Sequence, residues 1–569
     1  MEKTEYGPKL ELSRQIHAEK YRGEGESFYE AMTRIADSLK DDSNHFHDFR
    51  DILLNMRFLP AGRVQSAMGS PRKVTPYNCF VSGTIEDSFD GIMERAAQAG
   101  KTMRMGGGIG YDFSTLRPRG DRIVSLDSRS SGPISFMDIF DSVCRTISSA
   151  GHRRGAQMGV LRVDHPDIEE FVSAKTNTSQ LTNFNISVGV TDAFMHAVKN
   201  KQSFELKFEG STYKTVDAAS LWERIMRTTW DWAEPGVLFI DTINRMNNLR
   251  YCETIAATNP CAEQALPPYG ACLLGSFNLT KYIVMKATGP EFNIKQFTAD
   301  IPHVVRAMDN VVDRAIYPLP EQEYEAKSKR RMGLGVTGLA NTAAVLGYQY
   351  GSPKMVEFTR TILQVLAIGT YSASADLASE KGAFPLYDQA RYLESPFVQQ
   401  LPSFLIEKIG MQGIRNSHLT SIAPTGTISL SADNVSSGIE PPFMLEYERT
   451  IKTFDGTRKE VVKDWAYGQY YVKDKTAVEC SVDDHLNVLL AAAQWSDSAV
   501  SKTINCDPKM PWEEFKSIYM RAWEGGAKGC TTFNPAGKRM GILNATPSSE
   551  ENQGAACFID PETGKKTCE

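Results

Sequence analysis

The sequence predicts an α/β protein, because segments typical of strands alternate with segments typical of helices over hundreds of residues. Residues 183–188 and 236–240 are short apolar runs of strand-like composition, and the helix-like stretch 221–232 lies between them. The same pattern continues at residues 331–338. Strands separated by helices along the chain are characteristic of an α/β architecture.

Composition is that of a large globular protein. The chain has 569 residues, of which 41% are hydrophobic, and a net charge of -6. It contains no basic run interleaved with aromatic residues and no apolar stretch of about 18 residues, so we expect neither polymeric nucleic acid nor a membrane as a partner. The polar N-terminus favours a cytoplasmic protein. Its ten cysteines are too few for a disulfide scaffold and are better explained as catalytic, metal-binding or buried thiols.

The chain begins with a segment predicted to be helical. Apolar side chains recur there at the spacing of one helix face, at Phe28, Met32, Ile35 and Leu39. A strand-like run, 77–81, then carries Cys79. Asp87 and Ser88 precede the next helix, where a carboxylate or hydroxyl can accept hydrogen bonds from the amides of the first turn.

A glycine-rich stretch, 105–111, is a weak candidate for a dinucleotide site. Such a site needs a strand before the glycines and a helix after them, whereas a helix-like segment precedes this stretch and a strand-like one follows. Two arginine-bearing loops come next, 116–122 and 151–157. Guanidinium groups and exposed amides can both meet phosphate oxygens, so these loops suit phosphate binding. A pair of solvated loops is an equally good interpretation.

The strongest chemical signal lies in residues 259–279. Cys261 stands two residues from both Asn259 and Glu263, and Cys272 follows on a short apolar segment. Prolines in this stretch disfavour a helix. In an extended segment alternate side chains point the same way, so Asn259, Cys261 and Glu263 can line one face of a cavity. A buried cysteine is more often a small core residue. The polar neighbours and the second thiol nevertheless favour a reactive thiol.

Two later segments complete the set of motifs. Residues 421–429 form an apolar run that leads into hydroxyls around a glycine, and such a loop at a helix N-terminus can bind phosphate, although a simple capping turn explains it equally well. Residues 528–534 predict a last buried strand. The final residues have little to bury and are expected to be flexible, yet they carry Cys557 and Cys568.

In their joint order these motifs resemble the catalytic subunit of ribonucleotide reductases, over nearly the whole chain from about residue 50. The matching segments are Tyr77-Asn-Cys79, the loops of Arg117 and Arg154, Asn259-Pro-Cys-Ala-Glu263, Ala271-Cys272, Pro424-Thr-Gly-Thr427 and Gly438-Ile-Glu-Pro-Pro442. The resemblance implies a ten-stranded α/β barrel of two antiparallel five-stranded halves around a central finger loop. It also implies three parts: an N-terminal helical segment without an ATP cone, the barrel and a flexible redox tail, at residues 1–56, 57–540 and 541–569.

The resemblance assigns a role to each motif. Cys261 is expected to form a thiyl radical that removes the 3′-hydrogen of the ribose, while Glu263 accepts the 3′-hydroxyl proton and Asn259 hydrogen-bonds the ribose. Cys79 and Cys272 would supply the proton and two electrons and end as a disulfide. Substrate contacts are expected from Asn78, Pro424, Thr425, Gly426, Thr427, Ile428 and Ser429.

Regulation and electron supply are also implied by the resemblance. A deoxynucleotide or ATP effector that selects the substrate base is expected to bind at Asp87, Ser88, Arg117 and Arg154. Cys557 and Cys568 are the expected tail redox pair, reduced by a thioredoxin- or glutaredoxin-like protein. Dimeric members bind the effector at a subunit interface, so we expect a homodimer.

The radical source distinguishes the classes of this family. Members that import the radical from a ferritin-like subunit carry two adjacent tyrosines on the last barrel strand, and the alignment of 528–534 places Thr531 and Thr532 there. An aliphatic hydroxyl is too hard to oxidise for a relay. Residues 501–505 and 529–532, SKTIN and GCTT, resemble the adenosylcobalamin-dependent class II. We therefore expect adenosylcobalamin-dependent reduction of ribonucleotides, with diphosphates favoured as substrates and no metal site built from the chain's own residues.

Two alternatives stay open at this point. One is a class I-type catalytic subunit that receives its radical from a separate protein. The other is an inactive nucleotide-binding regulator, which would require the cysteine constellation to have decayed, whereas all five expected catalytic positions are present. The glycyl-radical class is disfavoured because an Arg-Val-x-Gly-Tyr sequence does not occur.

Overall fold

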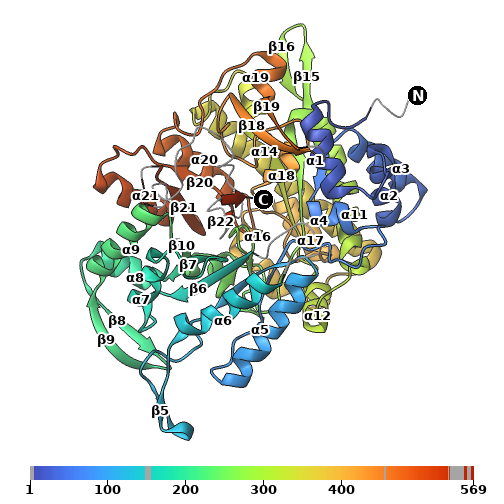
Figure 1. The fold of residues 1–569 in the computed structure, drawn as a ribbon. Helices are drawn as coiled ribbons and strands as arrows, with labels where there is room; N and C mark the ends of the chain where they lie inside the picture. Colours follow the sequence, from blue (N-terminus) through green and yellow to red (C-terminus); the bar gives the residue numbers. More distant parts are fainter. Residues whose placement is uncertain are drawn as a thin grey trace.

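The computed structural model describes residues 6–147, 156–453, 456–535, 537–538, 557–559 and 566–568. It has a mixed α/β architecture in which strands occupy the centre and helices surround them (Figure 1). The α/β class predicted from the alternation of segments is therefore confirmed.

The largest sheet has eight strands in the order β13-β2-β3-β6-β7-β10-β21-β20. Five neighbouring strands of this sheet, β2 to β10, are parallel. β13 is antiparallel to β2, and β21 is antiparallel to β10 but parallel to β20. The bounds are Cys79–Val81 (β2), Gly108–Asp112 (β3), Gln157–Arg162 (β6), Phe184–Val190 (β7), Gly236–Phe239 (β10), Ala271–Cys272 (β13), Thr503–Asn505 (β20) and Gly529–Phe533 (β21).

Helices connect the parallel strands, as crossover connections require. These helices are α5 (Phe89–Arg104), α6 (Pro133–Thr146), α7 (Ile168–Ser173), α8 (Asp192–Lys199) and α9 (Ala218–Trp232). The hydroxyl of Ser88 caps α5 by accepting a hydrogen bond from the Gly91 N–H at 3.1 Å. The capping predicted for this segment is thus made by the serine.

A second sheet contains β1 (Phe58–Pro60), β14 (Leu274–Asn278) and β17 (Gly333–Thr337), with β14 in the middle. β14 is antiparallel to β1 and parallel to β17. Two isolated parallel bridges extend the pairing beyond β17, from Leu334 to Thr420 and from Ile422 to Val500. β13 and β14 are separated by one residue, so a single run of chain pairs with β2 at its start and with β17 at its end.

The N-terminal region forms helices that pack on one side of the central strands (Figure 1). α2 buries the four apolar residues predicted to share a face, and a capping box between Ser27 and Glu30 fixes its start. The helices there are α1 (Glu11–Tyr21), α2 (Phe28–Leu39), α3 (Ser43–Leu54) and α4 (Gly62–Ala67).

The remaining helices pack around both sheets. They are α10 (Ile240–Met246), α11 (Ile294–Arg314), α12 (Pro320–Lys329), α13 (Leu339–Val345), α14 (Pro353–Lys381), α15 (Gln389–Leu393), α16 (Pro396–Gln399), α17 (Ser403–Gln412), α18 (Gly426–Leu430), α19 (Trp465–Tyr470), α20 (Val482–Gln494) and α21 (Trp512–Glu524). No helix in these described ranges is both long and apolar enough to cross a lipid bilayer.

Two-stranded pairs complete the described strands. They pair β4 (Arg122–Ile123) with β5 (Ser128–Arg129), β8 (Ser203–Phe208) with β9 (Ser211–Asp217), β11 (Ala257–Thr258) with β12 (Ala265–Leu266), β15 (Ile283–Lys286) with β16 (Gly289–Phe292), β18 (Glu446–Thr453) with β19 (Gly456–Lys463), and β22 (Cys557–Ile559) with β23 (Lys566–Cys568). The β11–β12 hairpin carries the motif around Cys261 and organises the site.

Candidate active site

The cysteine motif folds as the tip of the β11–β12 hairpin. The tip is closed by hydrogen bonds from the Asn259 N–H to the Gln264 carbonyl and from the Ala262 N–H to the Asn259 carbonyl, each 3.0 Å long. Ala262, directly after Cys261, has a φ of 64°. A non-glycine residue in the left-handed region is strained and persists only where its surroundings enforce it. The hairpin therefore holds Cys261 in an enforced conformation.

Three neighbouring segments fix this tip in place. The Glu263 carbonyl accepts a hydrogen bond from the Ala499 N–H at 2.9 Å, and the Pro260 carbonyl accepts one from Asn185 Nδ2 at 3.2 Å. β3 passes directly beneath, because a Cβ at Gly110 would lie 1.8 Å from the carbonyl oxygen of Thr258. The glycine-rich stretch thus admits the hairpin backbone, which explains its composition without a dinucleotide site.

Cys261 lies at the meeting point of two cavities and is half-buried. We call the first the α18 cavity, because the loop that leads into α18 forms one of its walls. Its walls also include three other residues with expected catalytic or substrate-binding roles, Asn78, Cys79 and Glu263. The structure therefore brings these residues together around one space with Cys261.

Cys79 and Cys272 face each other on neighbouring strands. They are direct partners in the antiparallel pairing of β2 with β13, and both side chains are buried. Directly opposed residues of an antiparallel pair have Cα atoms about 4.5–5.5 Å apart, within the range that a disulfide spans. Cys79 lines the α18 cavity and Cys272 lies behind it. This geometry permits a disulfide to form next to the space that Cys261 faces.

Asn259 was predicted to hydrogen-bond the ribose, but part of its side chain is used within the hairpin. Its side chain is fully buried, and its Oδ1 accepts a hydrogen bond from the Gln264 N–H at 3.0 Å, so one half of the amide folds the hairpin tip. Its Nδ2, like Oδ1 of Asn78, has no hydrogen-bond partner among the described residues. A buried polar atom without a partner is costly, so each is suited to a polar ligand group.

The loop before α18 supplies the opposite wall. Residues Pro424 to Ile428, which were predicted as substrate contacts, line the α18 cavity. Thr425 has a φ of 56°, and its hydroxyl accepts a hydrogen bond from the Gly438 N–H at 2.7 Å. That bond ties the loop to the Gly438–Pro442 motif. Ser429 is turned inward, where its hydroxyl donates to the Gly426 carbonyl at 3.0 Å and meets the Ser437 hydroxyl at 2.9 Å.

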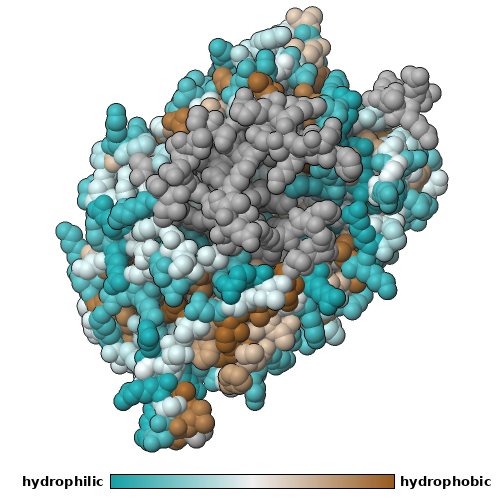
Figure 2. All heavy atoms as spheres, viewed as in Figure 1, coloured by the Kyte–Doolittle hydropathy of each residue, from teal (hydrophilic) through white to brown (hydrophobic). Residues whose placement is uncertain are grey.

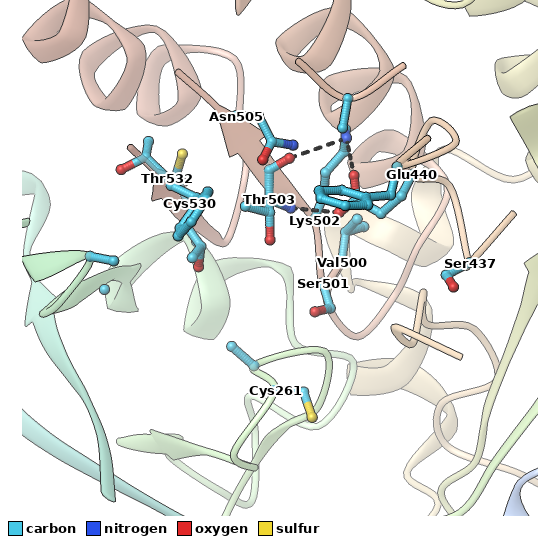
Figure 3. A pocket seen from close by; sticks show the side chains of 18 of the residues that line it. Cys261, Ser437, Glu440, Val500, Ser501, Lys502, Thr503, Asn505, Cys530 and Thr532 are labelled. Carbon is cyan, nitrogen blue, oxygen red and sulfur yellow. Dashed lines mark hydrogen bonds and ion pairs between the residues drawn. The ribbon is translucent and has the colours of Figure 1, made fainter. Parts of the chain in front are cut away.

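The second space, the β21 cavity, reaches Cys261 from the other side of the hairpin tip. Figure 3 shows Cys261 across an open space from Ser501, Thr503 and Asn505 on β20 and the segment before it. Further walls come from β7, β10, β21 and residues 434–444. The β21 cavity therefore borders the Cys261 thiol directly.

The two threonines of β21 have different surroundings. The Thr531 side chain is exposed, whereas Thr532 is buried and its hydroxyl is hydrogen-bonded to the Tyr519 hydroxyl at 2.8 Å. Both residues line the β21 cavity, and neither provides an oxidisable ring beside Cys261.

A buried ion pair stabilises the wall of the β21 cavity, and no local sequence pattern predicted it. The Lys502 ammonium is 2.5 Å from Glu440 Oε2, and Glu440 Oε1 accepts a hydrogen bond from the Thr503 N–H at 2.7 Å (Figure 3). Nδ1 of His485 lies 3.0 Å from the same ammonium. Burial, and then the charge of Lys502, hold the pKa of His485 well below its usual value. A neutral imidazole can accept the third hydrogen bond of this cluster.

The structure describes three of the four expected effector residues. The carboxylate of Asp87 accepts hydrogen bonds from Arg117 Nε at 2.6 Å and from the Arg117 N–H at 3.1 Å, next to the Ser88 cap of α5. Asp87, Ser88 and Arg117 therefore form one cluster, whereas Arg154 lies outside the described residues. In the tail, the backbone pairing of β22 with β23 places Cys557 opposite Cys568, and their side chains lie outside the described part.

Sequence reasoning missed several residues of the α18 cavity, and three of them have cationic or aromatic side chains. Lys20, Tyr21 and Arg63 line it, the first two from the end of α1 and the third from α4. Lys20 and Tyr21 lie in a segment that looked like a peripheral helical cap, and no local pattern signals a contact with α18. Only the three-dimensional packing reveals them.

Comparison with known proteins agrees with this geometry. The family model "Ribonucleotide reductase, barrel domain" matches residues 77–533. The vitamin B12-dependent ribonucleoside-diphosphate reductase of Mycobacterium tuberculosis is 35% identical over 87% of this chain and 73% of its own length. The same-named protein of Thermoplasma acidophilum is 32% identical over 91% of this chain and 69% of its own length. The vitamin B12-dependent ribonucleotide reductase of Streptomyces clavuligerus is 26% identical, over 90% and 62% respectively. The chain belongs to the ribonucleotide reductase family.

Proposed function

We propose that this chain reduces ribonucleotides to 2′-deoxyribonucleotides through a thiyl radical on Cys261, with adenosylcobalamin as the radical source. The observation that carries this proposal is the place of Cys261, which lines the α18 cavity on one side and the β21 cavity on the other. A single sulfur can thus be oxidised from one space and react in the other. Vitamin B12 dependence in the names of three similar proteins supports the class assignment.

The reaction uses the residues of the α18 cavity in sequence. The Cys261 sulfur radical takes the 3′-hydrogen atom of the ribose, and Glu263 accepts the 3′-hydroxyl proton. The 2′-hydroxyl then leaves as water with a proton from a cysteine of the Cys79–Cys272 pair. The other thiol gives a hydrogen atom to the 2′-carbon, and the pair closes as a disulfide. The electron released by this closure and the proton on Glu263 restore the 3′-hydroxyl, and Cys261 returns a hydrogen atom to the 3′-carbon. The buried, directly opposed positions of Cys79 and Cys272 suit this step.

The β21 cavity fits the cofactor. It borders the thiol directly, and its walls combine apolar side chains with a few hydroxyl and amide groups, as cofactor sites do. Ser501, Thr503, Asn505 and Thr531 would hold the bound cofactor. When bound, adenosylcobalamin supplies an oxidising equivalent through cleavage of its cobalt–carbon bond. The chain's own contribution is to hold Cys261 beside that space and to separate the space from the substrate.

We further propose the ten-stranded barrel that the family resemblance implies. One half would be β2, β3, β6, β7 and β10, which are parallel neighbours. The other half would be β13 with β14 as one strand, β17, residues 420–422, β20 and β21. The isolated bridges Leu334–Thr420 and Ile422–Val500 support continuity within the second half, and the β13–β2 and β10–β21 pairs join the halves in antiparallel fashion.

The division into residues 1–56, 57–540 and 541–569 is part of this proposal, as is a homodimer that binds a deoxynucleotide or ATP effector. The effector cluster Asp87, Ser88 and Arg117 lies at the start of α5. Phe89 and Met93 on the same helix are exposed. Figure 2 shows hydrophobic residues gathered on this face, where α5 and α6 lie in Figure 1. An exposed apolar face beside the cluster supports an interface there.

The substrates proposed are diphosphates, the reductant is a thioredoxin- or glutaredoxin-like protein and the location is the cytoplasm. The class I alternative is disfavoured because threonines occupy both relay positions on β21. An inactive regulator is disfavoured because Cys261, Glu263, Cys79 and Cys272 are all placed for chemistry.

The test is nucleotide reduction by the purified protein with and without adenosylcobalamin, with dithiothreitol as reductant and no second protein. Deoxynucleotide formation only in the presence of the cofactor is the expected result. Full activity without it, restored by a ferritin-like partner, would reject the class assignment while the cysteine chemistry stands.

A further inference from the structure

Helix α1 lies against α18, although 417 residues separate Ser13 from Leu430. The carboxylate of Asp433 accepts hydrogen bonds from the N–H groups of Lys9 and Leu10 at 2.6 and 2.9 Å, and the Ser13 hydroxyl donates to the Leu430 carbonyl at 2.7 Å. Residues 9 and 10, just before α1, thus contact residue 433, whereas residue 13, within α1, contacts residue 430. α1 therefore runs against the direction of α18, and its last turn arrives beside the start of α18.

The end of α1 forms part of the wall of the α18 cavity. Lys20 and Tyr21 both line it. Tyr21 is buried and rests on α4, because a Cβ at Gly62 would lie 2.6 Å from its Cε1 atom. This close seating fixes the last turn of α1 and so holds Lys20 at the cavity.

Arg63, the residue after Gly62, reaches the same cavity from α4. Its guanidinium lies over the glycine-rich turn, where a Cβ at Gly106 would be 2.6 Å from Nη1. Gly106 also has a φ of 97°, so a larger residue is excluded there on two grounds. Two cationic side chains from separate helices therefore line the same cavity as Thr425 to Ile428.

The acidic and the cationic side chains of the α18 cavity come from different segments of the chain. Among the described residues that line it, Glu263 is the one acidic side chain, and it belongs to the hairpin tip that carries Cys261. The loop before α18 offers hydroxyls and amides but no full positive charge. Charge-assisted hydrogen bonds are roughly twice as strong as neutral ones. Lys20 also offsets the negative end of the α1 dipole, which would otherwise oppose an anion there.

We propose that Lys20 and Arg63 bind the β-phosphate of the substrate, which a monophosphate lacks, and make this chain select a nucleoside diphosphate over the monophosphate. The inference rests on the proposed function and adds two residues, from α1 and α4, to its substrate site. The N-terminal helical segment thereby takes part in substrate selection.

The test compares CDP with CMP as substrates of the full chain, for Lys20→Met and Arg63→Met. We expect the KM for CDP to rise about tenfold to a hundredfold in each, with kcat retained and the kinetics with CMP little changed, because one charged hydrogen bond is lost. Lys20→Arg should restore the KM. Arg14→Met is the matched control, because Arg14 lies on the exposed side of α1 and pairs with Glu11, and it should leave both substrates unaffected.

Equilibrium binding of CDP and CMP, measured by calorimetry without adenosylcobalamin, separates this inference from the proposed function. Weaker binding of CDP but not of CMP by both methionine variants supports it even if turnover is never seen. An unchanged affinity for CDP in both variants, or an equal loss for CDP and CMP, would overturn it. Absence of turnover by the wild-type chain would instead count against the proposed function.

Discussion

Cys79 on β2 and Cys272 on β13 are direct antiparallel partners, and Cys79 lines the same cavity as Cys261. The strands on which they lie come from distant parts of the sequence and are joined by this pairing. A thiol pair in this arrangement can deliver two electrons to a bound molecule and close into a disulfide without moving the backbone.

The first prediction concerns that disulfide. In a chain whose Cys557 and Cys568 are both changed to serine, a single turnover without reductant should form one deoxynucleotide per chain together with one Cys79–Cys272 disulfide, detected by alkylation and peptide mass spectrometry. Cys272→Ser should abolish both. Cys144→Ser is the matched control, because Cys144 is equally buried but lies on α6, and it should behave as wild type. A turnover-dependent disulfide between any other pair would contradict the assignment.

The second prediction concerns the tail. If Cys557 and Cys568 pass electrons to the buried pair, a double serine variant should lose activity with a thioredoxin-like protein but keep it with dithiothreitol, which can diffuse into the cavity. Activity with both reductants is the measurement. Equal losses with the protein and the small dithiol would assign the tail cysteines another role.

The third prediction concerns the buried pair of Lys502 and Glu440. Lys502→Met leaves a carboxylate buried without its cation, so the free energy of unfolding in urea should fall by about 3–5 kcal/mol. The added change Glu440→Gln should recover part of that loss. Lys286→Met is the control, because Lys286 forms an exposed pair with Glu291, and such surface pairs contribute about 0–1 kcal/mol. Equal losses of unfolding free energy in the two lysine variants would show that the buried pair stabilises the fold no more than a surface pair does.

The fourth prediction concerns Lys528, whose ammonium donates to the backbone carbonyls of Ser496, Asp497 and Ser498. Burial lowers the pKa of Lys528 from 10.5 to about 8, with the charge of Asp497 opposing the shift. Between these pH values the unfolded chain binds the proton and the folded chain does not, so stability should rise with pH across this window.

The size of that rise is at most about 1.4 kcal/mol per pH unit. It should appear as the difference in unfolding free energy between the wild-type protein and Lys528→Met, which removes the effect of other titrating groups. A difference that stays constant from pH 8 to pH 10.5 would show that Lys528 keeps its ordinary pKa.

Local patterns predicted much of this architecture. The α/β class, the buried face of α2 and the strands that carry Cys79 and Cys272 follow from periodicity and composition. The motif around Cys261 indicated a reactive thiol, because its polar neighbours are unusual for a core cysteine. These features depend on residues close together in the chain.

Features that depend on distant contacts were not predictable. The glycines before β3 looked like a possible nucleotide loop, but Gly110 is needed because the Thr258 carbonyl passes over it. The partner of Lys502 is 62 residues away, and α1 meets a loop more than four hundred residues further on. Ser429 and Oδ1 of Asn259 are used for internal hydrogen bonds, which no sequence pattern distinguishes from ligand contacts.

The most direct test of the whole account is Cys261→Ser. A serine hydroxyl holds its hydrogen far more strongly than a thiol, so this variant should bind nucleotide with wild-type affinity but form no deoxynucleotide above the level without enzyme, even with adenosylcobalamin and dithiothreitol present. Measurable deoxynucleotide formation by the serine variant would contradict the central role of Cys261 as the radical that joins the two cavities.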